Sequence, residues 1–300
     1  MQKVAISIGD LNGIGIEIAL KSHDTIKQWI TPVYCINKKM LEKAAKLLNY
    51  KIPNDFEIFE IDGEFEIKPG QIDKNAGKYS FESFMAAIEL AKQNKADAIC
   101  TLPINKESWN KAGIKYKGHT EVLRDIFKKE AIMMLGCEKL YVALFTEHIP
   151  LKEVPKKIKK EKLIQFFLDF YRSTGFEKVG VLGLNPHAGD GGVLGDEEIK
   201  EILPAIIETN EMLNKEIFYG PLVPDIAFTS KKGRFIAMYH DQGLAPLKAL
   251  YFDESINVSL NLPILRTSVD HGTAFDIAYK GIAKTKSYEN AIKFILKHKN

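Results

Sequence analysis

Short apolar runs alternate with stretches of helical period along the whole chain, and this alternation constrains the fold more than any other feature. Runs such as Val4–Ile8, Ala96–Leu102 and Phe235–Tyr239 have the length of buried strands and end at polar or glycine residues. Ser80–Asn94 and Lys162–Ser173 carry apolar residues along one helical face. Strands that alternate with helices predict an α/β fold with mainly parallel sheets and helices on both faces.

The 300 residues are enough for two domains of about 100–200 residues each, and one large α/β domain is the alternative. We expect a first α/β domain at residues 1–150, to which the segment 265–300 returns, and a second α/β domain at residues 151–264. The boundary is predicted there because Pro150, Pro155 and a run of lysines interrupt the alternation.

Composition excludes several classes of protein. A net charge of +3 is too small to indicate a nucleic-acid partner, and no apolar run approaches the roughly 18 residues of a membrane span. The first residues are typical of a strand and not of a signal peptide. Cys35, Cys100 and Cys137 are widely spaced and form no disulfide framework, which favours a reducing cytoplasm.

Polar side chains follow several of the expected strands. His240 and Asp241 come directly after Phe235–Tyr239, and Lys248 lies a little further on. Ligands bind at the carboxyl ends of strands in α/β sheets, so this stretch is a candidate site. A structural histidine with an ion pair explains the same pattern equally well.

Two further histidines have the same setting. His148 follows an apolar run, and His187 lies in the loop N-P-H-A-G-D-G-G, whose glycines allow a close approach of the backbone to a ligand. Together with His240 they have the donor set of a divalent metal such as Zn²⁺. Only the fold can bring residues so far apart together, and three structural histidines remain the alternative. His23 and His298 are expected in polar surface helices.

Two glycine-containing turns precede expected helices. The turn Gly9–Gly15 resembles a phosphate cradle only weakly, and Asp10 is expected to cap the helix that follows. Gly118, His119 and Thr120 open another helix, either as an anion site or with Thr120 as the N-cap.

Several segments occur in a fixed order along the chain: G-D-L-N-G-I-G-I-E at the first turn, G-H-T-E at Gly118–Glu121, N-P-H-A-G-D-G-G at Asn185–Gly192, Y-H-D-Q-G at Tyr239–Gly243, and R-T-S-V-D-H-G-T-A at Arg266–Ala274. Together they resemble the 4-hydroxythreonine-4-phosphate dehydrogenase family (PdxA) of pyridoxal 5'-phosphate biosynthesis. The resemblance extends from Ile6 to Ala278. Leu11, Asn12 and Ile16 depart from the family pattern G-D-P-A-G-I-G-P-E.

The resemblance implies a homodimer of chains with two α/β/α domains, similar to isocitrate and isopropylmalate dehydrogenases. The active site is then expected in the cleft between the domains, shared across the dimer interface. The family's three metal-binding histidines match His148, His187 and His240. Its substrate-binding residues match His119, Thr120, Lys248, Asn257 and Arg266.

The implied reaction is the NAD- or NADP-dependent oxidation of 4-phosphohydroxy-L-threonine, followed by loss of CO₂ to give 3-amino-2-oxopropyl phosphate. One divalent ion, Zn, Mg or Co, is expected to assist both steps. Arg266 offers a planar fork to an anion and Lys248 a point charge. Asp241, Asp270 and Lys248 are the catalytic candidates, because either carboxylate can orient a histidine or accept a proton.

Gly189, Gly191 and Gly192 are expected to approach the cofactor. The alternative functions are a dehydrogenase of 4-phosphothreonate or 4-phosphoerythronate, a three-histidine metal hydrolase, and a phosphometabolite-binding protein without catalysis.

Overall fold

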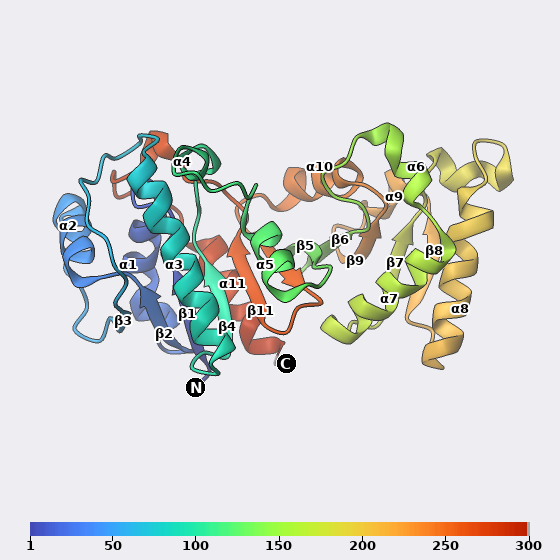
Figure 1. The fold of residues 1–300 in the computed structure, drawn as a ribbon. Helices are drawn as coiled ribbons and strands as arrows, with labels where there is room; N and C mark the ends of the chain where they lie inside the picture. Colours follow the sequence, from blue (N-terminus) through green and yellow to red (C-terminus); the bar gives the residue numbers. More distant parts are fainter. Residues whose placement is uncertain (299–300) are drawn as a thin grey trace. The chain divides into compact units, whose positions relative to one another are not determined.

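The computed structural model describes residues 1–298, and they divide into two compact units (Figure 1). The first unit comprises residues 1–129, 256–258 and the chain from residue 262 onward. The second comprises residues 130–255 and 259–261. The chain therefore leaves the first unit and returns to it. The two α/β domains with limits at residues 150 and 264 stay a prediction.

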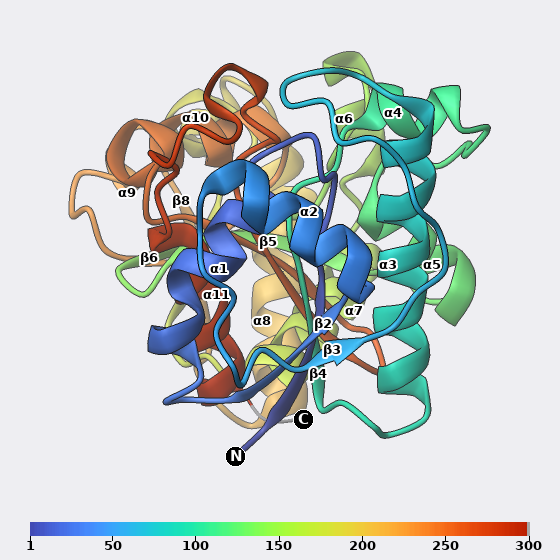
Figure 2. The ribbon, with the colours of Figure 1, turned by 90° about the vertical axis from the view of Figure 1, so that its left-hand side faces the viewer.

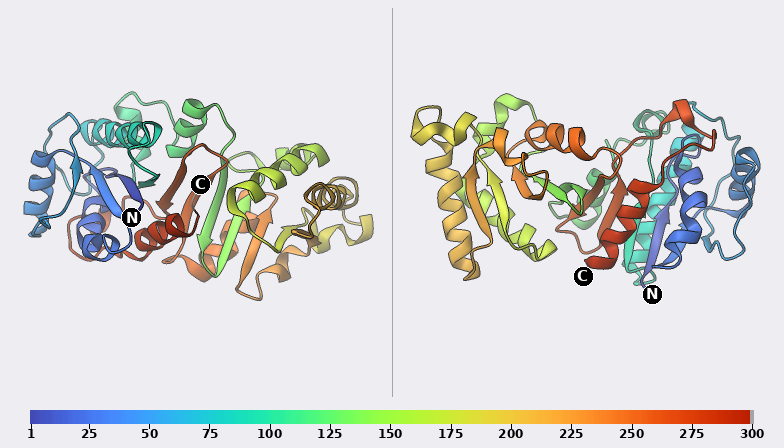
Figure 3. Two further views of the ribbon diagram at one scale, coloured as in Figure 1. Left: turned by 90° about the horizontal axis from the view of Figure 1, so that it is seen from below. Right: turned by 180° about the vertical axis from the view of Figure 1, so that it is seen from behind.

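The first unit contains a parallel sheet in the order β3-β2-β1-β4-β11. Its strands are β1 (Lys3–Ser7), β2 (Thr31–Cys35), β3 (Ile58–Phe59), β4 (Ala98–Thr101) and β11 (Leu265–Val269). Its helices are α1 (Gly15–Ile26), α2 (Lys38–Leu48), α3 (Lys74–Lys92), α4 (Lys106–Lys111), α5 (His119–Phe127), η4 (Phe275–Ile277) and α11 (Lys286–Lys297). Helix α3 covers one face of this sheet, and α1 and α11 cover the other (Figures 2 and 3).

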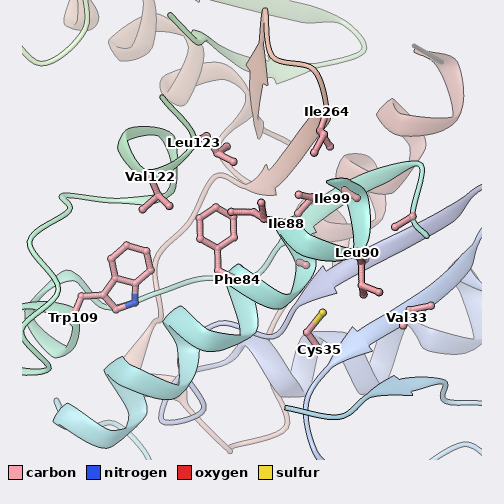
Figure 4. Packing of buried hydrophobic residues seen from close by; sticks show 14 residues of the cluster. Val33, Cys35, Phe84, Ile88, Leu90, Ile99, Trp109, Val122, Leu123 and Ile264 are labelled. Atoms are coloured by element: carbon pink, nitrogen blue, oxygen red, sulfur yellow. The ribbon is translucent and has the colours of Figure 1, made fainter. Parts of the chain in front are cut away.

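A hydrophobic core of the first unit lies between α3 and the strands β1, β2 and β4, and extends to α4 and α5 (Figure 4). Phe84 of α3 is fully buried, as is Trp109 of α4. The Trp109 Nε1–H donates to Ser80 Oγ at 2.8 Å. Val122 and Leu123 bring α5 into the same cluster. Burying each large apolar side chain contributes about 1.5–3 kcal/mol. Packing of Val122 and Leu123 therefore stabilises the position of α5 in the first unit.

The second unit has strands β5 (Ile132–Cys137), β6 (Leu140–Leu144), β7 (Val179–Leu182), β8 (Phe218–Leu222) and β9 (Gly233–Ala237). Their order is β5-β6-β9-β7-β8, with only β5 and β6 antiparallel. Strand β10 (Ile256–Leu260) is divided between the two units. The helical segments are η1 (Leu151–Glu153), α6 (Val154–Lys157), α7 (Lys160–Thr174), η2 (Pro186–Gly192), η3 (Glu198–Ile202), α8 (Leu203–Leu213), α9 (Pro224–Ala227) and α10 (His240–Tyr251).

The predicted α/β class with mainly parallel sheets is confirmed. Strand β11 is not among the strands that the apolar pattern predicts, because Arg266, Thr267 and Ser268 interrupt it. The structure buries all three, at 3%, 0% and 6% exposure. Within residues 1–298 no helix combines the length and the apolar character that crossing a membrane requires.

Candidate functional site

A buried polar cluster surrounds Arg266 in the first unit. The Arg266 Nε–H and Nη2–H groups donate to Thr101 Oγ1 at 3.1 and 2.6 Å, and Nη1–H donates to Asn257 Oδ1 at 3.4 Å. Arg266 Nη2 also lies 3.1 Å from His119 Nδ1. Three of the expected substrate-binding residues are thus brought together. Thr101 was not expected, and its only signal was its place at the end of an apolar run.

His119 is held in one neutral form by this contact. A guanidinium can only donate, so His119 Nδ1 accepts and the ring proton sits on Nε2. Burial and then the charge of Arg266 lower the pKa of His119 well below its usual range. In the described part of the chain, the buried Nε2 atom has no hydrogen-bond partner. Burial also lowers the pKa of Arg266 to about 10, which leaves it charged at neutral pH.

Helix α5 begins at His119, and Gly118 is its N-cap residue, without a side-chain hydrogen bond to the first turn. Of the two alternatives, the one with Thr120 as the N-cap is wrong, because Thr120 already lies inside the helix. The N–H groups at the start of an α-helix favour anions. An added Cβ at Gly118 would lie 3.9 Å from Lys106 Cε, so a cationic side chain is beside this turn.

In the second unit, His148 and His240 face each other with ring centroids 5.3 Å apart. His240 is the first residue of α10, and its Nδ1 lies 2.7 Å from Asp241 Oδ1. Since a carboxylate accepts, Nδ1 carries the proton and Nε2 keeps a lone pair that can bind a metal ion. Lys248 is on the same helix, with its Nζ 5.8 Å from the Phe252 ring centroid.

His187 lies in η2, in a backbone conformation that only a few non-glycine residues adopt. His187, Ala188 and Asp190 all have left-handed φ, at 53°, 53° and 45°. Among residues 1–298 no group of three His, Cys, Asp or Glu side chains is placed to hold a metal ion. The fold pairs His148 with His240 in the second unit.

The other expected cofactor and catalytic residues are divided between the units. Gly189, Gly191 and Gly192 have φ of 81°, 65° and 98°, all in the region that favours glycine. Asp270 follows β11 in the first unit, and its backbone N–H donates to Ser287 Oγ at 3.1 Å. Asp241 belongs to the second unit and is largely exposed.

Asp10 does not cap α1, contrary to expectation. The helix begins at Gly15 after Ile14, without a side-chain cap. The buried Asp10 instead accepts the Asn12 N–H at 2.9 Å through Oδ1, and burial raises its pKa to about 6. Asn12, one of the departures from the family pattern, holds the segment at residues 68–71 by donating to Gln71 O at 2.9 Å.

His23 was expected at the surface but is only 1% exposed. Its Nδ1 lies 3.0 Å from Tyr34 Oη and its Nε2 lies 3.2 Å from Asp55 Oδ1. Phe56 packs against both the His23 and Tyr34 rings. The polar helix pattern missed this residue because a later loop covers it.

The mainly parallel α/β sheet, with a buried arginine cluster that includes the end of strand β4, defines the class of the protein as an α/β protein with a candidate binding site at its strand ends. The sequence model described as "Pyridoxal phosphate biosynthetic protein PdxA" matches residues 28–295. The chain belongs to the PdxA family, as the sequence motifs predicted.

Named relatives cover nearly the whole chain. It is 64% identical over 295 residues to a 4-hydroxythreonine-4-phosphate dehydrogenase of Sulfurimonas denitrificans, covering 97% of this chain and 96% of the relative. The enzyme of the same name from Campylobacter fetus is 60% identical, with 99% and 98% covered. A crystal structure of 4-hydroxythreonine-4-phosphate dehydrogenase from Klebsiella pneumoniae superimposes with a TM-score of 0.81 at 32% identity, covering 99% of this chain and 97% of that chain.

Proposed function

We propose that the chain is a 4-hydroxythreonine-4-phosphate dehydrogenase. It oxidises 4-phosphohydroxy-L-threonine with NAD or NADP and releases CO₂ and 3-amino-2-oxopropyl phosphate, for pyridoxal 5'-phosphate biosynthesis. The observation that carries this proposal is the 64% identity over 295 residues to a relative of that name. The three buried free cysteines support a cytoplasmic location.

The first unit supplies the groups that bind the phosphorylated end of the substrate. Arg266 offers a forked, charged donor, and His119 offers its buried Nε2–H. Thr120 adds a hydroxyl in the first turn of α5, and Asn257 fixes one arm of the Arg266 fork at 3.4 Å. The uncapped N–H groups of that turn complete an anion site.

The second unit supplies His148 and His240 to one Zn²⁺, Mg²⁺ or Co²⁺ ion. When bound, such an ion lowers the pKa of a substrate hydroxyl and stabilises the charge left by departing CO₂. Asp241 holds the His240 ring in the tautomer that leaves Nε2 free to bind. Lys248 supplies positive charge to the substrate, and Asp270 and Lys248 are the candidates for moving the proton. The glycines of η2 lie against the cofactor.

His187 completes the metal site from a second copy of the chain, so the active form is a homodimer with shared sites. Two histidines paired without the third in one copy support this arrangement. Large apolar side chains are exposed near η2 and α8: the exposed fraction is 79% for Val193, 51% for Ile199 and 50% for Ile207. Such a patch supports an interface there.

Mixing two inactive variants tests the shared site. His187→Ala keeps the pair of histidines, whereas His148→Ala keeps His187. A mixed dimer of these two variants has one complete site if the ligands come from both copies. Activity that returns on mixing supports the proposal, and no recovery after proven subunit exchange contradicts it.

The reaction itself is tested by the absorbance of the reduced cofactor, with 4-phosphohydroxy-L-threonine, NAD⁺ or NADP⁺, and with or without EDTA. Turnover that needs both dinucleotide and metal supports the proposal. Loss of the substrate without dinucleotide, measured directly because the absorbance cannot report it, indicates a metal hydrolase. Phosphate binding that survives EDTA without turnover indicates a binding protein, and faster turnover of 4-phosphothreonate or 4-phosphoerythronate reassigns the substrate.

A further inference from the structure

The loop that carries His187 is held in a conformation that its own sequence does not favour. Five successive residues, His187 to Gly191, have left-handed φ, and three of them are not glycine. Each non-glycine residue in such a region costs about 1–3 kcal/mol and persists only when its surroundings fix it. Some other part of the second unit must therefore stabilise this turn.

Glu198 provides that stabilisation. Its side chain is 2% exposed, and Oε1 accepts the backbone N–H groups of both Leu184 and Asn185 at 2.7 Å. Its Oε2 accepts Asn185 Nδ2–H at 3.0 Å. Three hydrogen bonds to one carboxylate, all at the residues directly before Pro186 and His187, fix the start of the loop. Charged acceptors make such bonds stronger than neutral ones.

The same carboxylate also touches the far side of the turn. An added Cβ at Gly183 would lie 3.1 Å from Glu198 Oε1, and one at Gly189 would lie 2.8 Å from Oε2. At Gly189 the carboxylate and the Gly195 carbonyl oxygen, at 2.9 Å, leave no room for a Cβ, whereas at Gly183 the nearest atom to an added Cβ is Ala188 Cα at 2.9 Å, with the carboxylate next to it. Glu198 thus lies between the end of β7 and the left-handed turn, and contacts residues on both sides of His187.

Gln242 extends this arrangement to the other metal-site histidine. Its Oε1 accepts the Met238 N–H at 2.7 Å, just before His240, and its Nε2–H donates to Gly183 O at 2.6 Å. The start of the His187 loop is therefore tied directly to the turn that presents His240. Glu198 lies on the π-helical turn η3, a type of turn that is frequent at functional sites.

We propose that Glu198 is a positioning residue for the metal site, acting through Leu184 and Asn185 to hold His187 in its left-handed conformation. This inference rests on the proposed function, in which His187 binds the metal ion. Residues that orient metal ligands in this way typically contribute 10–100-fold to metal affinity or activity.

The test uses Glu198→Ala, Glu198→Gln and a matched control, Glu201→Ala, in the full-length protein. Glu201 is on the same turn, but its carboxylate accepts from Lys159 Nζ and Lys160 N at 2.9 and 2.7 Å, away from the loop. Titration with Co²⁺, followed by its visible spectrum, and the steady-state constants are measured for each variant.

Glu198→Ala is expected to lower Co²⁺ affinity and kcat by about 10–100-fold while the KM for the phosphorylated substrate is unchanged. Glu198→Gln keeps an oxygen that can accept the two backbone N–H groups, so it recovers part of the loss. Glu201→Ala is expected to change only the unfolding midpoint. A folded Glu198→Ala with wild-type Co²⁺ affinity and kcat, or equal losses in both alanine variants, would overturn the proposal. If the alanine variant does not fold, Glu198→Gln is compared with the wild type. Co²⁺ affinity and kcat below those of the wild type support the proposal, and wild-type values overturn it.

Amide hydrogen exchange separates this inference from the proposed function. A wild-type protein without metal-dependent dehydrogenase activity would refute the function alone. Faster exchange at Leu184, Asn185 and residues 187–191 in Glu198→Ala, but not in Glu201→Ala, would still support the positioning role. Unchanged exchange there would overturn it whatever the activity.

Discussion

Asp10→Asn is expected to change the free energy of unfolding, relative to the wild type, more favourably at neutral pH than at acid pH. The Asp10 carboxyl is fully buried, and Oδ1 accepts the Asn12 N–H at 2.9 Å. In the described part of the chain Oδ2 has no hydrogen-bond partner. Burial raises the pKa from 3.8 to about 6. Asparagine keeps an acceptor for Asn12 but never carries the charge.

The expected size follows from the pKa. A rise of about two pH units, at about 1.4 kcal/mol per unit, corresponds to about 3 kcal/mol. The folded state binds the proton of Asp10 more tightly than the unfolded state does. The stability from this protonated acid is complete below about pH 4 and is lost as the pH rises through about 6. The variant's free energy of unfolding, minus that of the wild type, should therefore increase by up to about 3 kcal/mol between about pH 4 and pH 7.

Urea unfolding at several pH values measures this difference. The fluorescence of Trp29 and Trp109 reports on the first unit, where both residues lie. Glu64→Gln is a control of opposite sign, because Lys43 and Lys39 lower the pKa of Glu64 and its contribution is lost as the pH falls. A difference for Asp10→Asn that is flat or decreases with pH would refute the reasoning.

Three further changes test separate parts of the structure. Arg266→Lys keeps the charge but loses the fork, so the substrate KM should rise about 10–100-fold, for a loss of about 1.5–3 kcal/mol, and an unchanged KM would contradict the phosphate role. His23→Gln should reduce the loss of stability when the pH falls below about 6.5. Burial lowers the pKa of His23, so the folded state favours the neutral ring and loses this contribution to stability as the pH falls. Identical acid unfolding curves for the variant and the wild type would argue against this. Gly189→Ala should lower the unfolding midpoint, since its φ of 81° and the 2.8 Å approach to Glu198 both oppose a Cβ; an unchanged midpoint in thermal unfolding would show that the turn relaxes.

The sequence predicted the alternation of strands and helices because buried strands such as β6 and β7 are apolar throughout. It did not predict β11, because hydrophobicity marks burial only where the buried side chains are apolar. Arg266 is buried because Thr101 and Asn257 satisfy its N–H groups. That satisfaction depends on the pairing of β11 with β4, which no local pattern contains.

The site residues show the same limit. The resemblance named His119, His148, His187 and His240, but only the fold shows that His148 faces His240. The role of Glu198 could not be inferred from its position in the sequence, because an acidic residue near the start of a helix is already favoured by the helix dipole. Its hydrogen bonds to Leu184 and Asn185 are contacts between different elements, so they appear only in three dimensions.

The return of the chain to its first unit has a consequence for how the protein is made. Strand β4 has β1 on one side and β11 on the other, and α11 packs against both α1 and β11. During translation the ribosome must therefore synthesise residues 130–255 before the earliest strands can gain their last neighbour. The first unit therefore begins to emerge before the second unit but is completed after it. Until β11 has been made, the edge of β4 lacks its partner strand, and an unpaired strand edge is open to chaperones and to neighbouring chains.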